Sequence, residues 1–589
     1  MAGRTTAPRG HPPGRGDDRR RRVHHRHQAG VPPLDGGIGP HGRQPADPVH
    51  RRTRGHDPTT HEGGRERVSR ALTTTTPETS PSTRAEQPRL PLIFTALILA
   101  MLMSALGQMI FSAALPTIVG ELGGVEHMTW VITAFLLGQT ISLPIFGKLG
   151  DQFGRKYLFM FAVCLFMAGS ALGGFAGSMD VLILARAIQG VAGGGLMILS
   201  QAITADVVSA RQRGKYMGIM GSIFGLSSVL GPVLGGWFTD GPGWRWGLWL
   251  NIPMGALTLV GIALFLTLPN HAQGGKLDWA GMATMALATT SFILTVTWGG
   301  REYDWTSPAI LGLITAAVVF SVLFIIVERR APDPLVPMWL FSNHNFRLTT
   351  AAGLIAGIFM FGSLAYMPTY LQMVHSMSPT EAGLMMVPMM IGLMGTSVVV
   401  GALVTRTGRY RIYPVVGMAV TGLALWLLSG LSHDSSLPEV GGYLFVLGFG
   451  LGCAMQILVL IVQNSFPIAV VGTATAANNF FRQIGGAAGS ALVGGIFVSN
   501  LSGLLNDRLP AALSQLGEGA AETGARISGH GANLTPGLVQ SLPTPVRIAI
   551  DAAYSDALTP VFALLAPLAI LSAVVLFFVH EERLKETVS

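Results

Sequence analysis

Charged residues are scarce in this chain of 589 residues, where Asp, Glu, Lys and Arg make up 12% and apolar residues 49%. Roughly a quarter of the residues in a soluble globular protein are charged, so this balance excludes an ordinary soluble fold. Cysteine is rare as well, since Cys164 and Cys453 are the only two and lie far apart inside apolar segments. They provide neither a disulfide framework nor a CxxC metal site. The lipid bilayer is therefore the expected solvent.

Catalytic patterns are also lacking. Histidine outside the first 90 residues falls only at the ends of apolar segments or between them, and no HExxH pair occurs. No His/Asp set or pair of carboxylates suggests acid–base chemistry. We therefore expect no catalytic residue, no metal and no cofactor, and disfavour a membrane enzyme.

Positive charge is concentrated at the N-terminus. Residues 1–90 hold seventeen arginines against nine acidic residues, which accounts for the whole formal charge of +8. This Arg/Pro/His-rich tail has no apolar periodicity, so we predict that it is disordered. The run Arg19–Arg22 could bind nucleic acid or anionic lipid. We favour a tail without function, of which residues 1–68 need not be native, and predict no nucleic-acid partner.

A membrane-spanning helix needs about 20 apolar residues, because the hydrocarbon core is roughly 30 Å thick. That rule predicts fourteen spans, at 92–118, 128–147, 157–177, 181–205, 216–238, 248–268, 280–299, 308–327, 348–373, 382–404, 412–431, 441–463, 471–497 and 557–579. No signal peptide is recognisable, so we expect the first span to direct insertion.

Loop charge predicts the orientation. With the N-terminus inside, the short inner connections collect thirteen Lys and Arg residues, whereas the short outer ones hold only Arg245 and Arg301. By the positive-inside rule both termini are cytoplasmic. Residues 500–556 form the one long outer segment, either as a surface-lying helix pair or as a flexible insertion.

A turn motif occurs twice. Gly147, Leu149, Gly154 and Arg155 follow the second span in the pattern Gly-x-Leu-x₄-Gly-Arg, and the same pattern begins at Gly401 after the tenth span. Internal repeats are typical of transporters that rock two halves about a central site. The repeat predicts a six-helix bundle at 91–270, an inserted transmembrane hairpin at 276–330, a second six-helix bundle at 345–580 and a tail at 581–589.

The first copy of the turn adds Asp151 and Lys156 to its glycines and arginine. In this form it resembles the first signature of the major facilitator superfamily, in which the turn latches the outward-open state. Asp151 and Arg155 stand four residues apart, and Asp206 at the inner end of the fourth span offers a second carboxylate. We interpret Gly147, Asp151, Gly154, Arg155, Lys156 and Asp206 as a conformational latch, although positive-inside charge alone would explain the lysines.

The fifth span carries an ordered set of small residues. They are Gly218, Gly231, Pro232, Gly235 and Gly236. This set resembles the antiporter signature of the same family, with Ser227 standing where glycine is usual. Proline removes a backbone hydrogen bond and glycine allows close helix approach, so the segment can bend and pack tightly.

Polar residues inside the spans are candidates for a cavity. Arg186 and Gln189 lie in the fourth span within a third family-like signature, and Gln201 and Gln108 lie in the fourth and first spans. An intramembrane arginine is costly unless it faces a cavity or a partner. We predict a substrate or proton cavity lined by these four residues, which would suit neutral, zwitterionic or anionic cargo. Hydrogen bonding of Arg186 to helix carbonyls is the structural alternative.

Residues 244–255 and 370–384 further resemble the fourteen-helix drug:proton antiporter branch, and the resemblance covers about 90–585. It implies an all-α integral membrane protein of the major facilitator fold that exports small lipophilic molecules, as a monomer in the bacterial cytoplasmic membrane. One residue departs from the branch, because Gly107 stands where an aspartate is usual. Proton coupling would then use Asp206 or another peripheral acid, with Arg186. An uncoupled uniporter or importer and a non-transporting sensor remain the alternatives.

Overall fold

A computed structural model describes residues 90–584 apart from 125–126, 269–273, 301, 529–533 and 535. Every named element in that part of the chain is a helix. Thirteen helices there are long and apolar enough to cross a membrane, and α13 (Ile412–Leu428) is a shorter apolar helix. The prediction of an all-α membrane protein with about fourteen spans is confirmed. Residues 1–89, which include nearly all of the expected disordered tail, lie outside the described residues.

The first group of helices packs within itself through α1–α4, α2–α4, α3–α4, α1–α5, α1–α7 and α3–α7 contacts. Its members are α1 (Leu90–Leu122), α2 (Met128–Phe153), α3 (Arg155–Gly174), α4 (Met179–Val207), α5 (Ala210–Asp240), α6 (Trp246–Trp249) and α7 (Asn251–Phe265).

A helical hairpin follows, formed by α8 (Trp279–Trp298) and α9 (Pro308–Arg330). The two helices pack on each other, and α8 also contacts α2 and α15. Few side chains of α9 are buried, and its exposed face carries Leu, Ile and Val. Exposed apolar residues on a long helix are what lipid contact requires. The hairpin is therefore attached to the rest of the protein through α8, and α9 presents its apolar face to lipid.

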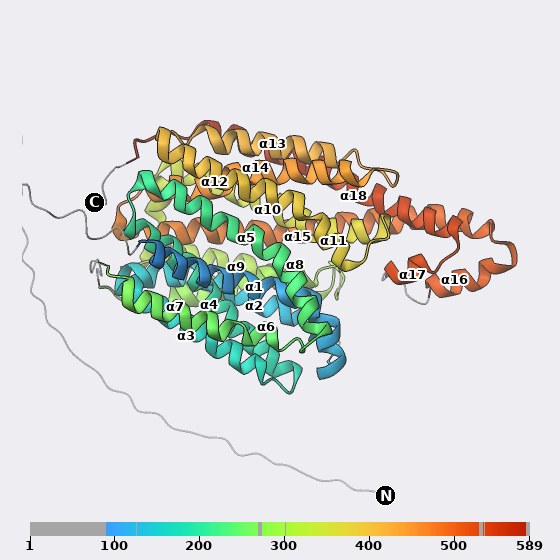
Figure 1. Cartoon of the computed structure of the whole chain (residues 1–589), viewed down its shortest axis with the longest axis horizontal. Coiled ribbons are helices and arrows are strands. Elements are labelled where there is room, and N and C mark those ends of the chain that lie inside the picture. Colours follow the sequence, from blue (N-terminus) through green and yellow to red (C-terminus); the bar gives the residue numbers. More distant parts are fainter. Residues whose placement is uncertain are drawn as a thin grey trace, which may run out of the picture. The chain divides into compact units, whose positions relative to one another are not determined.

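The second group packs through α10–α15, α12–α14, α13–α14, α13–α18 and α15–α18 contacts. Its main helices are α10 (His344–Val374), α11 (Pro379–Met385), α12 (Val387–Thr407), α13, α14 (Leu437–Asn464), α15 (Val471–Ser514) and α18 (Thr544–Phe577). Short helices complete the chain, at η2 (Met338–Ser342), η3 (Ile468–Val470), η4 (Gly517–Gly519), α16 (Ala520–Ser528) and α17 (Pro536–Gln540). The two groups lie side by side in Figure 1, where blue to green helices occupy one side and yellow to red helices the other.

Residues 500–556 differ from the sequence prediction. Helix α15 continues without a break to Ser514, and α18 begins at Thr544, thirteen residues before the predicted span. Their extensions pack together, since the Arg508 guanidinium lies 2.6 Å from the Asp556 carboxylate. In Figure 1 these extensions, with α16 and α17, project beyond the ends of the other helices. The two ends of the segment are thus helical continuations of the flanking spans and not a surface-lying helix pair.

Candidate functional site

The turn between α2 and α3 is made by one glycine. Helix α2 ends at Phe153, α3 begins at Arg155, and Gly154 between them has φ +94°. That backbone conformation is accessible to glycine and strained for other residues. The turn therefore places the last residues of α2 directly beside the first residue of α3.

Arg155 connects two carboxylates at this turn. Its Nη2 lies 2.7 Å from Asp151 Oδ1, its Nη1 pairs with Asp206, and all three side chains are almost completely buried. Arg155 also donates to the carbonyl oxygens of Ala202 and Ile468, at 3.1 and 2.9 Å. Removing one partner of a buried ion pair typically costs several kcal/mol, so this cluster is a strong local restraint.

The same cluster joins the two helix groups. Asp151 Oδ2 accepts hydrogen bonds from the backbone N–H and the hydroxyl of Thr473, at 2.7 and 2.8 Å. Thr473 lies in the first turn of α15, where the helix dipole favours a negative charge. Gly147 packs against the same turn, because a Cβ there would overlap Ala476 and lie 2.9 Å from the Gly472 carbonyl oxygen. This end of the interface is closed.

The second copy of the turn makes the equivalent contacts with α5. Thr405, four residues after Gly401 as Asp151 is after Gly147, accepts a hydrogen bond from the backbone N–H of Lys215 at 3.1 Å. Arg211 donates to the Thr405 carbonyl oxygen, also at 3.1 Å. The two copies of the motif therefore contact the starts of α15 and α5 in a pseudo-symmetric way. The first copy contributes the Asp151 carboxylate as acceptor, whereas the second contributes the neutral hydroxyl and carbonyl oxygens of Thr405.

Lys156 takes a separate position in the first turn. Its ammonium donates to the carbonyl oxygens of Leu266 and Ala263, at 2.6 and 3.1 Å. Both carbonyls are at the C-terminal end of α7, where a cation is favourable. Lys156 thus caps α7 and does not contact the carboxylates of the cluster.

The glycines of α5 differ in what they contact. A Cβ on Gly218 would overlap the Ser397 carbonyl oxygen of α12, and one on Gly231 would overlap Met109 of α1. Around Gly236 no atom lies within 4 Å of such a Cβ. Gly218 therefore permits close contact between the helix groups and Gly231 close contact within one group. The same interpretation of Gly236 is wrong.

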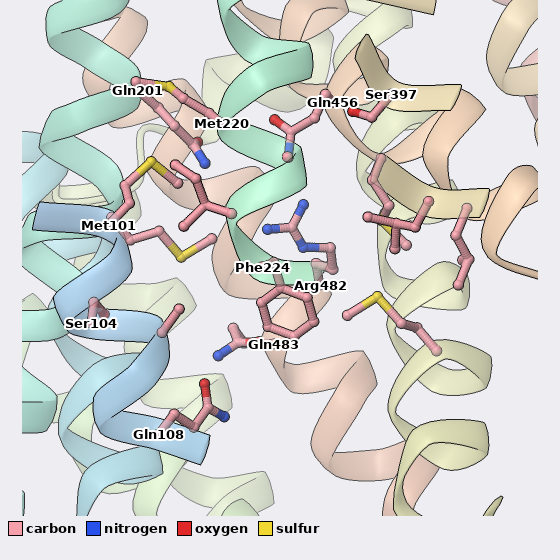
Figure 2. Close-up of a pocket in the computed structure, with 18 of the residues that line it drawn as sticks. Met101, Ser104, Gln108, Gln201, Met220, Phe224, Ser397, Gln456, Arg482 and Gln483 are labelled. Carbon is pink, nitrogen blue, oxygen red and sulfur yellow. The ribbon is translucent and has the colours of Figure 1, made fainter. Parts of the chain in front are cut away.

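A pocket lies between the two helix groups. Its walls are largely apolar and rich in methionine, and its polar lining includes Ser104, Gln108, Gln139, Gln201, Ser397, Gln456, Arg482 and Gln483. Figure 2 shows the Arg482 guanidinium in the middle of this space, with Gln108 and Gln201 on opposite sides. Largely apolar walls with a few convergent polar groups are typical of a site for a small organic molecule. Of the predicted cavity residues, Gln108 and Gln201 line the pocket.

Arg186 and Gln189 are placed elsewhere. Arg186 is 1% exposed and its guanidinium lies 4.3 Å from the ring centroids of both Phe111 and Phe135. It donates to the Val131 carbonyl oxygen at 3.2 Å and to Gln189 Oε1 at 3.0 Å. The prediction that these two side chains line the cavity is therefore wrong. The cause is the rotation of α4, which turns both side chains into the core of the first group. There Arg186 bonds to a helix carbonyl oxygen, as the structural alternative predicted.

Arg482 is the residue that sequence reasoning missed. It lies in α15, lines the pocket and bonds to Asn479 Oδ1. Asn479 Nδ2 in turn donates to Gln201 Oε1 of α4 at 2.9 Å, so a polar chain crosses the interface. The rule that selected Arg186, a charge inside a predicted span, applies equally to Arg482 within 471–497. That signal was available in the sequence and would have found it.

Comparison with known proteins identifies the family of the chain. The sequence model of the Major Facilitator Superfamily matches residues 97–490. An uncharacterized MFS-type transporter of Mycobacterium tuberculosis is 39% identical over 494 residues, covering 83% of this chain and 70% of the relative. The multidrug transporter protein MdtP of Bacillus subtilis is 37% identical, covering 82% and 89%.

The solved structure of the proton:xylose symporter XylE superposes with a TM-score of 0.53 at 13% identity, covering 84% of this chain and 97% of that one. At that identity the likeness concerns the fold alone. Together with the two helix groups, the repeated turn and the central pocket, these matches place the chain in a family of transporters. The chain belongs to the major facilitator superfamily, among relatives of the multidrug efflux type.

Proposed function

We propose that this protein is a secondary active exporter of small lipophilic molecules. The observation that carries the proposal is the methionine-rich pocket between the helix groups, closed at one end by the Asp151–Arg155 cluster. A central site with a separable gate is what alternating access requires. The relative MdtP is named a multidrug transporter, which favours several lipophilic cargoes over one nutrient.

Transport would follow from rocking of the two groups. In the present arrangement Arg155 and Asp151 hold the first turn against η3 and α15. Opening that end separates Asp151 from Thr473 and exposes the pocket to the other side of the membrane. From the loop charges, the closed end faces the cytoplasm, and an exporter would release cargo from the pocket at the opposite end. The working unit is a monomer in the cytoplasmic membrane, with both termini inside.

Protons are the proposed driving ion, with Asp206 as the carrier. Asp206 and Asp151 share the Arg155 guanidinium. Protonation of Asp206 removes one of the two negative charges that hold Arg155 in place, which weakens the cluster joining the groups. Proton entry would thus be linked to opening of the gate.

Inverted membrane vesicles containing the full chain test the export function. Under an imposed pH gradient, acid inside, they should accumulate members of a panel of charged and neutral drugs above vesicles that lack the protein. Uptake only by right-side-out vesicles would identify an importer. If no cargo moves in either orientation, export is refuted and a sensor is the better interpretation.

A further inference from the structure

Arg482 differs from the other buried arginines in its partners. Arg155 binds two carboxylates, Arg186 lies between two aromatic rings, and Arg213 donates to three backbone carbonyl oxygens. Within the described part of the chain, Arg482 makes one hydrogen bond, to the neutral amide of Asn479. The other three arginines are satisfied by the protein itself. Arg482 alone among these four also faces the pocket.

A guanidinium has five N–H donors arranged to bind an oxyanion through two parallel hydrogen bonds. Arg482 is only 8% exposed, so its charge is largely removed from water. A buried charge with one neutral partner is costly, and an oxyanion in the pocket would offset that cost. The remaining N–H donors and the positive charge of Arg482 both favour an oxyanion as the ligand group.

The remaining pocket wall defines the rest of the ligand. Met101, Met220, Met360, Met455 and Phe224 supply flexible, polarizable apolar surface. Methionine adapts to ligands of different shape, so the wall selects an apolar body without fixing its outline. Resting on the proposed export function, we infer that the cargo is an organic anion with an apolar body, whose carboxylate or sulfonate binds Arg482.

Binding of such an anion also acts on the interface between the helix groups. The guanidinium of Arg482 is held by Asn479 Oδ1, and the amide of Asn479 donates to Gln201 Oε1 across the interface. An oxyanion that takes the Arg482 N–H group now bonded to Asn479 Oδ1 frees Asn479 to reorient. Asn479 is thus a positioning residue that links an occupied pocket to the contact between α15 and α4.

Three probes with one apolar body test the inference, namely pyrenebutanoate, pyrenebutanamide and pyrenebutylamine. Their affinities for the purified full chain in detergent are measured by equilibrium dialysis. The wild type should bind the acid at least about tenfold more tightly than the amide. That ratio corresponds to the lower end of the free energy that hydrogen bonds to a charged group contribute. The amine should bind most weakly of the three. Arg482→Gln should reduce the acid-to-amide ratio to about one.

Asn479→Asp is the sharper variant, because it adds a carboxylate beside Arg482 with almost no change in volume. It should also abolish the preference for the acid, and should strengthen binding of the amine. Arg508→Gln, the same chemical change in an exposed pair outside the pocket, should leave all three affinities unchanged. Thermal melting of each variant confirms that it is folded.

An acid-to-amide ratio near one in the wild type overturns the inference, and so does a ratio that survives both Arg482→Gln and Asn479→Asp. Failure of the wild type to bind the acid has the same meaning. None of these results touches the export function, which the vesicle experiment with the wider drug panel tests separately.

Discussion

At the scale of single residues, three buried arginines of this protein lie in three different surroundings. Arg155 connects the two helix groups, Arg186 lies in the core of one group, and Arg482 faces the pocket. Burial does not distinguish them, because all three are almost fully buried. Their partners do, and substitutions at the three positions should therefore have different consequences.

Arg155→Ala should abolish export and destabilise the protein. It leaves Asp151 and Asp206 buried without their counter-ion, a loss of about 3–5 kcal/mol for a broken buried pair. Vesicle export and thermal melting in detergent measure the two effects. Lys156→Ala is the matched control, since it removes only two bonds to helix carbonyls. Equal export and equal melting of the two variants would contradict the role of Arg155 as a conformational latch.

Arg186→Gln should lower stability and leave ligand selectivity unchanged. The substitution removes contacts with Phe111 and Phe135, each of which contributes on the order of 2 kcal/mol where the cation is desolvated. A fall of several degrees in the melting midpoint is expected for the purified protein. The acid-to-amide binding ratio should stay at its wild-type value. A changed ratio would instead return Arg186 to the cavity.

At the scale of helices, close contact between α5 and α12 depends on Gly218. A Cβ at this position would overlap the backbone of Ser397, which a rotamer change cannot relieve. Backbone contact of this kind is typical of small residues at membrane helix interfaces. Two glycines of the fifth span therefore have a local physical cause. Gly218 is needed for close contact with α12, and Gly231 for close contact with α1.

Gly218→Ala should separate the α5–α12 contact and reduce export several-fold, whereas Gly236→Ala in the same helix should be tolerated. Overpacking a tight contact typically costs about 1–3 kcal/mol. Export rates normalised to the amount of folded protein measure the difference. If both variants transport alike, close packing at Gly218 is not needed for the cycle.

At the scale of the whole molecule, the gate contacts and the pocket belong to one interface. Asp151 binds the start of α15, and Asn479 and Arg482 lie two turns further along the same helix. A movement of α15 relative to α2 and α4 therefore changes both places together. This connection makes proton linkage at Asp206 testable through transport.

Asp206→Asn should remove the acceleration of export by a pH gradient while some downhill cargo movement persists. The amide cannot gain or lose a proton, so the Arg155 cluster no longer responds to the gradient. Initial rates in inverted vesicles with and without the gradient measure the effect. Export that is still stimulated by the gradient in this variant would refute Asp206 as the proton carrier.

The sequence by itself determined the all-α membrane fold, the number of spans and the turn at Gly147–Lys156. These features depend on hydropathy over about 20 residues and on glycine spacing within ten, which are local properties. Only the tertiary structure decided which intramembrane arginine faces the pocket. Arg186 and Arg482 satisfy the same sequence rule, and the rotation of α4 and α15 against their neighbours places one in a core and the other in the pocket. That rotation depends on contacts between residues far apart in the chain, such as Gln201 with Asn479, which no local pattern contains.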